Sequence, residues 1–346
     1  MRSFLKPAAG LTCLFALAVT GCSSSSGDSS NSSSGGTQSA TSTPSSTPSS
    51  SASSSTTSYA PYVSATTAAD MDSKGSPSTY NLSFAIASGS TCTPTWNGTT
   101  AIGDSAVTSR ISALKTSGAT VRVSFGGASG KELAETCTSA TALAKAYGEA
   151  LDAAGSSQAD FDIEGDALTD STSVALRSKA IALLQKERTG LKVSFTLPVM
   201  PSGLDSDSLA LLESANDNAV AVSTVNIMTM NYGESYSGDM GDYAITSATA
   251  THTQLKKVFG LSDAGAWQGM ALTSMIGVND VSGETFSLSD AAQVRTFAES
   301  KKVAWVSMWS TFRDQQCASG SSDDDAATDC SGVTQSAGAF GEAFAG

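Results

Sequence analysis

The sequence predicts an α/β fold, a single (β/α)8 TIM barrel in residues 59–346. Short runs rich in β-branched and aromatic residues alternate there with longer helical stretches. This alternation favours a parallel sheet, and eight repetitions favour a sheet closed into a barrel. The length of the segment also suits one barrel, for which about 250 residues or more are usual.

The elements follow one another in a regular order. We expect strands at residues 59–63, 81–87, 120–125, 159–163, 192–198, 224–230, 269–276 and 303–309. Between them, helical patterns cover residues 104–116, 140–154, 171–187, 206–221, 247–259 and 289–301. A last apolar pattern, residues 335–344, closes the chain.

The N-terminus predicts export. Positive residues precede an apolar stretch too short to span a bilayer, which is typical of a signal peptide, here residues 1–21. The stretch ends in Val19-Thr20-Gly21-Cys22, which resembles the lipobox of bacterial lipoproteins. By this resemblance Cys22 becomes the lipidated first residue. An ordinary signal peptide with an incidental cysteine is the alternative.

A serine-rich segment follows, residues 22–58. It has almost no apolar surface whose burial would offset the entropy of ordering. We therefore expect a disordered linker that tethers the barrel to the membrane.

The composition excludes several functions. The chain has 32 Asp and Glu against 19 Lys and Arg, a formal net charge of −13. Such a surface repels nucleic-acid phosphates, so we expect no nucleic-acid partner. The single histidine, His252, disfavours His-dependent nucleophiles and histidine-rich zinc sites. It lies in a polar run that predicts a solvent-facing helical position. We expect no metal and no cofactor, and chemistry that depends mainly on carboxylates.

Four cysteines remain after Cys13 and Cys22 are set aside, an even number in an exported chain, so disulfides are expected. Three connectivities are open. Cys317 and Cys330 bracket one loop and most simply pair together, which leaves Cys92 with Cys137.

Three acids alternate with apolar residues in the fourth predicted strand: Asp160, Asp162 and Glu164. Alternation puts them on one face, which in a barrel lines the interior toward the carboxyl-terminal rim, where active sites lie. Like charges this close do not all ionise, so at least one pKa rises, as a general acid requires. An exposed edge strand with solvated acids is the alternative.

These acids also resemble a family signature. Asp-x-Asp-x-Glu at the end of the fourth strand is similar to that of glycoside hydrolase family 18, the chitinases. Ser124-Phe125-Gly126-Gly127 resembles that family's Ser-x-Gly-Gly. Residues 59–63, 225–233 and 309–314 resemble its first, sixth and eighth strands, so the resemblance covers nearly all of the body.

The resemblance implies a retaining hydrolase of β-1,4-linked N-acetylglucosamine polymers. Glu164 would protonate the glycosidic oxygen, and the substrate's own 2-acetamido oxygen would attack the anomeric carbon to form an oxazolinium ion. Asp162 would hydrogen-bond the acetamido N–H, and Asp160 would share a proton with Asp162.

Two segments depart from the family pattern. Residues 157–158 replace an Asp and a Gly at the base of the fourth strand, where we expect a structural effect. On strand six, where many members read Met-x-Tyr-Asp, residues 228–231 read Met-Thr-Met-Asn and a tyrosine follows at Tyr232. Period-two alternation places Tyr232 on the face of Met228 and Met230. We therefore expect its hydroxyl in the pocket.

Trp309, at the end of strand eight, is implied as the hydrophobic floor under the sugar; an ordinary core tryptophan is the alternative. Trp305 is expected in the core. The other substrate-binding residues expected are Met228, Met230, Asn231, Ser124, Gly126 and Met275, with Asn279 and Asp280 near strand seven as further cleft residues.

Two other functions stay open. A lectin-like barrel binds sugar without cutting it, although Glu164, whose loss marks such proteins, is present. An endo-β-N-acetylglucosaminidase would apply the same chemistry to peptidoglycan or glycans. In every case we expect a monomer in the bacterial cell envelope or outside the cell, with chitin or another N-acetylglucosamine polysaccharide and, through Cys22, the membrane as partners.

Overall fold

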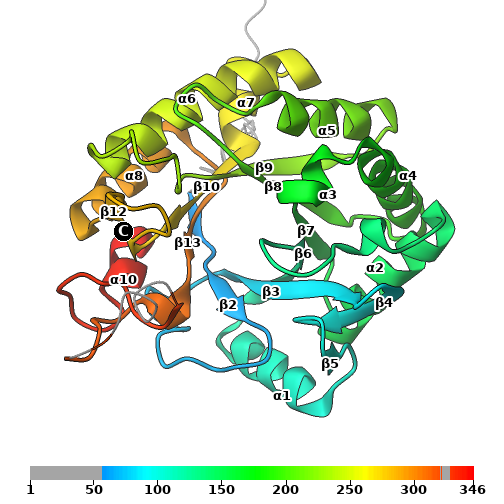
Figure 1. Ribbon diagram of the computed structural model, residues 1–346, viewed down its shortest axis with the longest axis horizontal. Helices are drawn as coiled ribbons and strands as arrows, with labels where there is room; N and C mark the ends of the chain where they lie inside the picture. Colours follow the sequence, from blue (N-terminus) through cyan, green and yellow to red (C-terminus); the bar gives the residue numbers. More distant parts are fainter. Residues whose placement is uncertain (1–56, 320, 322–327) are drawn as a thin grey trace, which may run out of the picture. The chain divides into compact units, whose positions relative to one another are not determined.

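Eight strands form a ring in the computed structural model, which describes residues 57–319, 321 and 328–346 (Figure 1). The first strand is split at Ala60-Pro61 into β1 (Ser58–Tyr59) and β2 (Tyr62–Ser64). β1 pairs with the last strand and β2 with the second, both in parallel, so the split strand joins the two ends of the sheet. Proline interrupts the strand because it has no N–H to donate.

The other strands neighbour one another in chain order, all in parallel: β3 (Thr79–Ser88), β6 (Thr120–Gly126), β7 (Gln158–Asp162), β8 (Lys192–Pro198), β9 (Val222–Met228), β10 (Met270–Met275) and β13 (Trp305–Trp309). All eight predicted strands are present. The predicted barrel is therefore confirmed, with strand ends that differ from the predicted ones by at most two residues.

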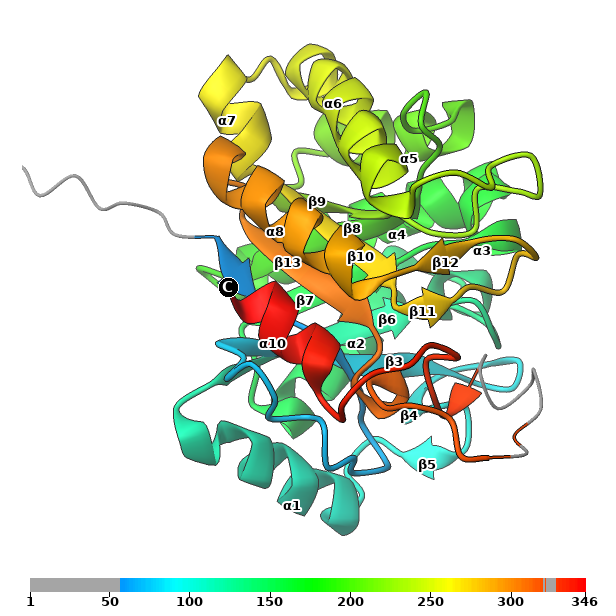
Figure 2. The same cartoon turned by 90° about the vertical axis from the view of Figure 1, so that its left-hand side faces the viewer.

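Helices surround the ring: α1 (Ser105–Leu114), α2 (Ala140–Ala154), α4 (Ser171–Glu187), α5 (Ser206–Asp217), α6 (Met240–Phe259) and α8 (Leu288–Lys301) (Figure 1). Two of these, α2 and α4, have the predicted bounds. The predicted start of α6 at residue 247 is wrong, because the Asp239 side chain caps the helix by accepting from the backbone N–H of Asp242. The short C-terminal helix α10 (Ala339–Ala345) lies beside α8 (Figure 2).

Several short elements were not predicted. β4 (Thr91–Trp96) turns back antiparallel on β3 and pairs with β5 (Thr100–Ala101), and β11 (Gly277–Val278) pairs with β12 (Thr285–Phe286) after β10. Helix α3 (Gly165–Thr169) directly follows Glu164, and α7 (Asp263–Gln268) precedes β10. Short 3-10 turns occupy residues 115–117, 133–135 and 311–313.

The apolar core lies between the ring and the helices. Phe125, Phe161 and Phe195 are in register on three adjacent strands, β6 to β8, with ring centroids 5.3 and 5.7 Å apart. All three are buried, and Tyr147 of α2 packs edge-on against the first two. Because side chains alternate along a strand, this outward apolar row requires the residues between to point into the barrel.

Both disulfides have the pairing that the sequence favoured, Cys92 with Cys137 and Cys317 with Cys330. The first joins β4 to the segment before α2. The second closes the loop that precedes the C-terminal helix.

The prediction of a solvent-facing His252 is wrong. The side chain is buried, with the residue 7% exposed, and its ring stacks on Trp267 at 4.0 Å between centroids. Its Nε2 lies 3.0 Å from the carbonyl oxygen of Asp263. The polar neighbours misled the interpretation because α7, which covers this face, was not foreseen.

The predictions for residues 1–56, including the signal peptide, Cys22 and most of the linker, lie outside the described residues. Thr57 and Ser58, predicted as linker, belong to the barrel: Thr57 is buried and its hydroxyl donates to the carbonyl of Ala298. Among the described residues, no helix combines the length and apolarity that crossing a membrane requires.

Candidate active site

Strand register places the predicted acids inside the ring. Ser124, Asp160 and Ser194 are paired on β6, β7 and β8, and one level higher Asp162 lies beside Thr196. Strand β7 ends at Asp162, so Glu164 lies just beyond its carboxyl end, immediately before α3. The expected shared face and rim position are therefore present.

Asp160 is an acceptor held by four hydroxyl groups. It is 1% exposed. Its Oδ2 accepts from Tyr62 at 2.9 Å and Ser124 at 2.7 Å, and its Oδ1 accepts from Ser194 at 2.6 Å. Thr196 lies 2.9 and 3.0 Å from the two oxygens. These hydrogen bonds fix Asp160 in place beneath the cleft, whose lining does not include it.

Asp162 and Glu164 are the two acids that interact at the carboxyl end of β7. Burial raises the pKa of Asp162 well above its ordinary value, and the charges of Glu164 and Asp160 raise it further. Burial also raises the pKa of Glu164, while its hydrogen bond with Asp162 lowers this pKa and the charge of Asp280 raises it. The coupled pair therefore loses its proton at a higher pH than a solvent-exposed carboxyl group does. The sequence paired Asp162 with Asp160; in the structure Asp160 is held by hydroxyl groups instead, and the charges of both Glu164 and Asp160 raise the pKa of Asp162.

A cleft of about 520 Å³ opens above this pair. Its floor is aromatic: Trp309 stacks on Phe84 with centroids 5.6 Å apart and an interplanar angle of 20°, and Tyr62 meets Trp309 edge-on at 5.9 Å. The lining comprises Tyr62, Phe84, Ala128, Asp162, Glu164, Thr196, Met228, Met230, Asn231, Thr273, Met275, Asp280 and Trp309. Acids beside an aromatic floor suit a neutral sugar, whose C–H groups pack on an aromatic face.

The cleft continues in both directions. On one side, a hollow that includes Met200 and Asp205 shares Glu164 and Met228 with it. On the other, a hollow along β3 and the segment 128–131 shares Phe84 and Trp309. Glu164 thus lines both the cleft and the first of these hollows.

Five of the predicted substrate-binding residues line the cleft: Trp309, Met228, Met230, Asn231 and Met275. Ser124 and Gly126 do not. Ser124 is fully buried beneath the cleft as a donor to Asp160. Gly126 has φ +96°, and a Cβ there would lie 2.1 Å from the carbonyl oxygen of Asp162, so this glycine lets β6 approach β7 closely.

The prediction for Tyr232 is wrong. The residue is 4% exposed, its ring packs against Tyr236 and Tyr243, and its hydroxyl lies 3.4 Å from Ser247 of α6, away from the cleft. Burial raises its pKa. Period-two alternation fails because β9 ends at Met228 and Asn231 adopts a positive φ of 54°.

Asn231 and Asp280 occupy the wall that Tyr232 was expected to reach. The Asn231 side chain donates to Asp280 Oδ2 at 3.0 Å. Buried Glu284, between β11 and β12, accepts the backbone N–H of Gly233 at 2.8 Å and fixes the loop after β9. Asn279, by contrast, is buried and donates to the carbonyls of Met275 and Gly277, so its expected cleft position is wrong.

Sequence reasoning missed Phe84 and Thr196. Both had a usable signal: each lies on a predicted strand, and Thr196 shares the inward face of β8 with Ser194.

Trp305 is buried as expected, and the guanidinium of Arg122 lies 3.9 Å above its ring. Among the described residues, no group of three or more His, Cys, Asp or Glu side chains is arranged to hold a metal ion.

Comparison with known proteins gives two curated relatives. The chain is 33% identical over 275 residues to a probable bifunctional chitinase/lysozyme of Escherichia coli, covering 74% of this chain and 31% of that protein. It is 32% identical over 276 residues to endochitinase 11 of Metarhizium anisopliae, covering 74% and 52%. The chain thus spans a third to a half of the length of these relatives. No family model matches it.

Solved structures share the fold. Active domain 2 of a thermostable chitinase from Pyrococcus furiosus, complexed with chito-oligosaccharides, superposes with a TM-score of 0.73 at 28% identity, over 83% of this chain and 92% of that one. A GH18 chitinase from Pseudoalteromonas aurantia has a TM-score of 0.53 at 12% identity, over 73% and 94%, which is a likeness of fold alone.

Proposed function

Because the chain is a chitinase-like member of glycoside hydrolase family 18, we propose that it hydrolyses β-1,4-linked N-acetylglucosamine polymers. The observation that carries the proposal is the pair of buried Asp162 and half-buried Glu164 beside the Trp309 floor. No metal or cofactor takes part in the proposed reaction.

Glu164 is the general acid. Burial raises its pKa, which favours the protonated form that a general acid requires, and its place at the strand end exposes it to the cleft. The proton passes to the glycosidic oxygen, so the leaving sugar departs as a neutral alcohol. General acids of this kind contribute about 10²–10⁴ in rate.

The nucleophile comes from the substrate. The 2-acetamido oxygen attacks the anomeric carbon to form an oxazolinium ion, and water opens this ion with retention. Asp162 accepts a hydrogen bond from the acetamido N–H and stabilises the positive charge that develops on the oxazolinium ion. The four donors around Asp160 support the proposal because they leave that carboxylate no free oxygen for a reaction.

Cleavage is internal to the polymer. The groove continues past Glu164 on both sides, toward Met200 and along β3, so sugars have room on each side of the scissile bond.

The direct test is release of soluble oligosaccharides from colloidal chitin by residues 57–346, beside the Glu164→Gln variant. We expect the variant to lose at least about 100-fold in rate. Wild-type protein that binds chitin without releasing products would support the lectin-like alternative. Full activity in the variant would refute the role of Glu164.

Peptidoglycan is the second candidate substrate, favoured by the similarity to a protein named as a probable chitinase/lysozyme. Release of reducing ends from purified peptidoglycan, measured in parallel, separates the two polymers.

Membrane attachment through Cys22 belongs to the same proposal, with residues 1–21 as the signal peptide. Cys22→Ala should move the full chain from the membrane fraction to the soluble fraction. Continued membrane retention of the variant would contradict the anchor.

A further inference from the structure

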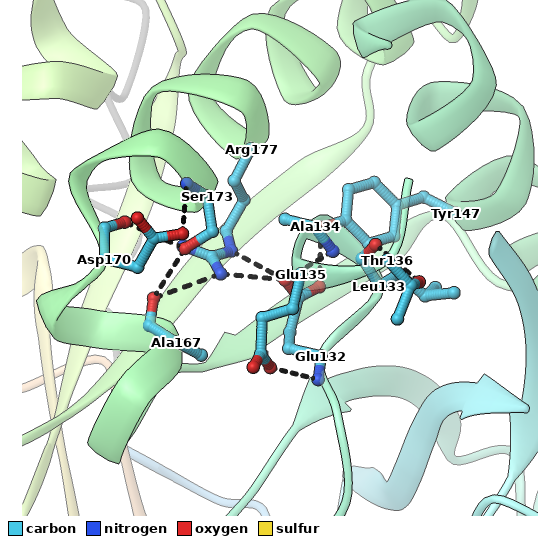
Figure 3. Close-up of polar contacts among 10 residues, drawn as sticks. All are labelled: Glu132, Leu133, Ala134, Glu135, Thr136, Tyr147, Ala167, Asp170, Ser173 and Arg177. Atoms are coloured by element: carbon cyan, nitrogen blue, oxygen red, sulfur yellow. Dashed lines mark hydrogen bonds and ion pairs between the residues drawn. The ribbon is translucent and has the colours of Figure 1, made fainter. Parts of the chain in front are cut away.

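A buried polar cluster lies outside the cleft, beside the turn that follows Glu164 (Figure 3). We call it the Glu132 cluster: Glu132 in the segment after β6, Tyr147 of α2 and Arg177 of α4. Glu132 and Arg177 are 3% and 1% exposed, and none of the three lines the cleft. Buried charges require a partner, and here they have one in each other.

Glu132 collects donors from three elements. Its Oε1 accepts from the Tyr147 hydroxyl at 2.6 Å. Its Oε2 accepts from Nε and Nη2 of Arg177 at 3.1 and 2.8 Å, and from the backbone N–H of Ala134 at 2.8 Å. One carboxylate therefore fixes α2, α4 and the segment after β6 relative to one another.

Arg177 extends the cluster to the catalytic turn. Its Nη2 also donates to the carbonyl oxygen of Ala167 at 3.3 Å. That oxygen accepts from the Ser173 hydroxyl at 3.2 Å as well. Ala167 belongs to α3, which begins at Gly165, directly after Glu164. The backbone that carries the acid is thus attached to a buried guanidinium.

The same cluster touches the strand end from the other side. Gly127 donates its backbone N–H to the carbonyl of Asp162 at 2.9 Å. The Glu132 Cγ atom lies 3.4 Å from where a Cβ on Gly126 would stand, so its side chain lies next to Gly126. Contacts before and after the Asp162–Glu164 pair therefore converge on Glu132 and Arg177.

We infer that Glu132 and Arg177 are positioning residues that hold the turn 164–167 so that the carboxyl group of Glu164 stays aligned with the glycosidic oxygen. This inference rests on the proposed function and deepens it. Displacing a catalytic group by about 1 Å can cost about 100-fold in rate, while substrate binding on Trp309 does not depend on that alignment.

The test compares two substrates in three variants. Arg177→Lys keeps the charge and loses the two-nitrogen contact with Glu132. Tyr147→Phe removes one hydrogen-bond donor to Glu132 and keeps the ring that packs on Phe125 and Phe161. This variant can therefore be measured even if Arg177→Lys does not fold. The control is Arg188→Met, because Arg188 also joins α4 to α2, through Asp152 at 2.7 Å, yet contacts neither α3 nor the turn.

On chitotetraose, measured well below each thermal midpoint, we expect Arg177→Lys to lower kcat about 10- to 100-fold with KM within about twofold. Tyr147→Phe should lower kcat less, and Arg188→Met not at all. On 2,4-dinitrophenyl chitobioside, whose leaving group needs little protonation, the loss for Arg177→Lys should largely disappear. Equal losses on the two substrates, or unchanged kcat in a folded variant, would overturn the inference.

Hydrogen–deuterium exchange tests, independently of activity, whether Arg177 holds the turn 164–167. The amides of residues 165–170 should exchange faster in Arg177→Lys than in wild type, and at the wild-type rate in Arg188→Met. Unchanged exchange in Arg177→Lys contradicts the positioning role. Wild-type protein that cleaves neither substrate refutes the proposed function instead, and the exchange rates still test whether Arg177 holds the turn.

Discussion

The surroundings of Asp162 oppose its ionisation. Burial has the largest effect, followed by the charges of Glu164 and Asp160. In the unfolded chain its pKa returns to about 3.8. Above that pH the unfolded state releases a proton that the folded state retains until the pH exceeds the raised folded pKa. The free energy of unfolding therefore falls as pH rises through this window.

Replacing Asp162 by Asn removes this dependence. We expect the thermal midpoint of Asp162→Asn, relative to wild type, to rise as the pH is raised above about 3.8, because only wild type must keep a proton on a carboxyl group that is ionised in the unfolded chain. Asp207→Asn, on the exposed surface of α5, is the control for replacing an aspartate outside the cleft. A flat difference for Asp162→Asn would contradict its raised pKa.

Asp280 acts on Glu164 through charge. It lines the cleft, and its negative charge raises the pKa of Glu164. Asp280→Asn removes that charge, so Glu164 ionises at lower pH and the alkaline limb of the kcat/KM profile should move to lower pH. The Asp207→Asn variant again serves as the control. An alkaline limb that stays in place would exclude this influence.

At the scale of elements, the close approach of β6 to β7 depends on one glycine. Gly126→Ala would place a Cβ 2.1 Å from the Asp162 carbonyl oxygen, at a φ of +96°. Such a backbone conformation alone costs a non-glycine residue about 1–3 kcal/mol. We expect Gly126→Ala to lose more unfolding free energy than this, and to have a lower kcat because Asp162 is displaced. Urea unfolding and kcat on chitotetraose measure both.

The matched control for this substitution is Gly89→Ala. Gly89 also has a positive φ, +58°, but a Cβ there meets no atom within 4 Å. Gly89→Ala should lose only the unfolding free energy that a positive φ costs a non-glycine residue, and its kcat should stay at the wild-type value. Equal effects of the two substitutions would show that close strand packing at Gly126 is unimportant.

Strands and their inward faces were predictable because alternation is a local property. The acids of β7, Asp160 and Asp162, and Met228 of β9 followed from it. Alternation could not predict Tyr232, since the strand ends at Met228 and a positive φ at Asn231 turns the chain. Nor could it predict Asp280 as the partner of Asn231, because that contact joins residues 49 apart in sequence.

At the scale of the whole molecule, the two disulfides constrain loops of different length. Their cysteines are 45 and 13 residues apart. From loop entropy alone, we expect Cys92→Ser/Cys137→Ser to cost about 4 kcal/mol and Cys317→Ser/Cys330→Ser about 3 kcal/mol of unfolding free energy. Urea unfolding of the two double variants tests the order. The reverse order would show that native-state contacts outweigh loop length.

The barrel as a whole could be predicted because eight local patterns repeat in sequence. The Glu132 cluster could not, because Glu132, Tyr147 and Arg177 come from separate elements and none belongs to a motif. His252 shows the same limit: its burial depends on Trp267, fifteen residues later in the chain, on a helix that no local pattern predicted.

In the proposed mechanism, Glu164 supplies only the proton and the substrate supplies the nucleophile. Digestion of partly N-acetylated chitosan, followed by identification of the sugar at each new reducing end, tests this mechanism. We expect N-acetylglucosamine at essentially every new reducing end, because the acetamido group of that sugar must attack. Glucosamine at the frequency found in the substrate would contradict it.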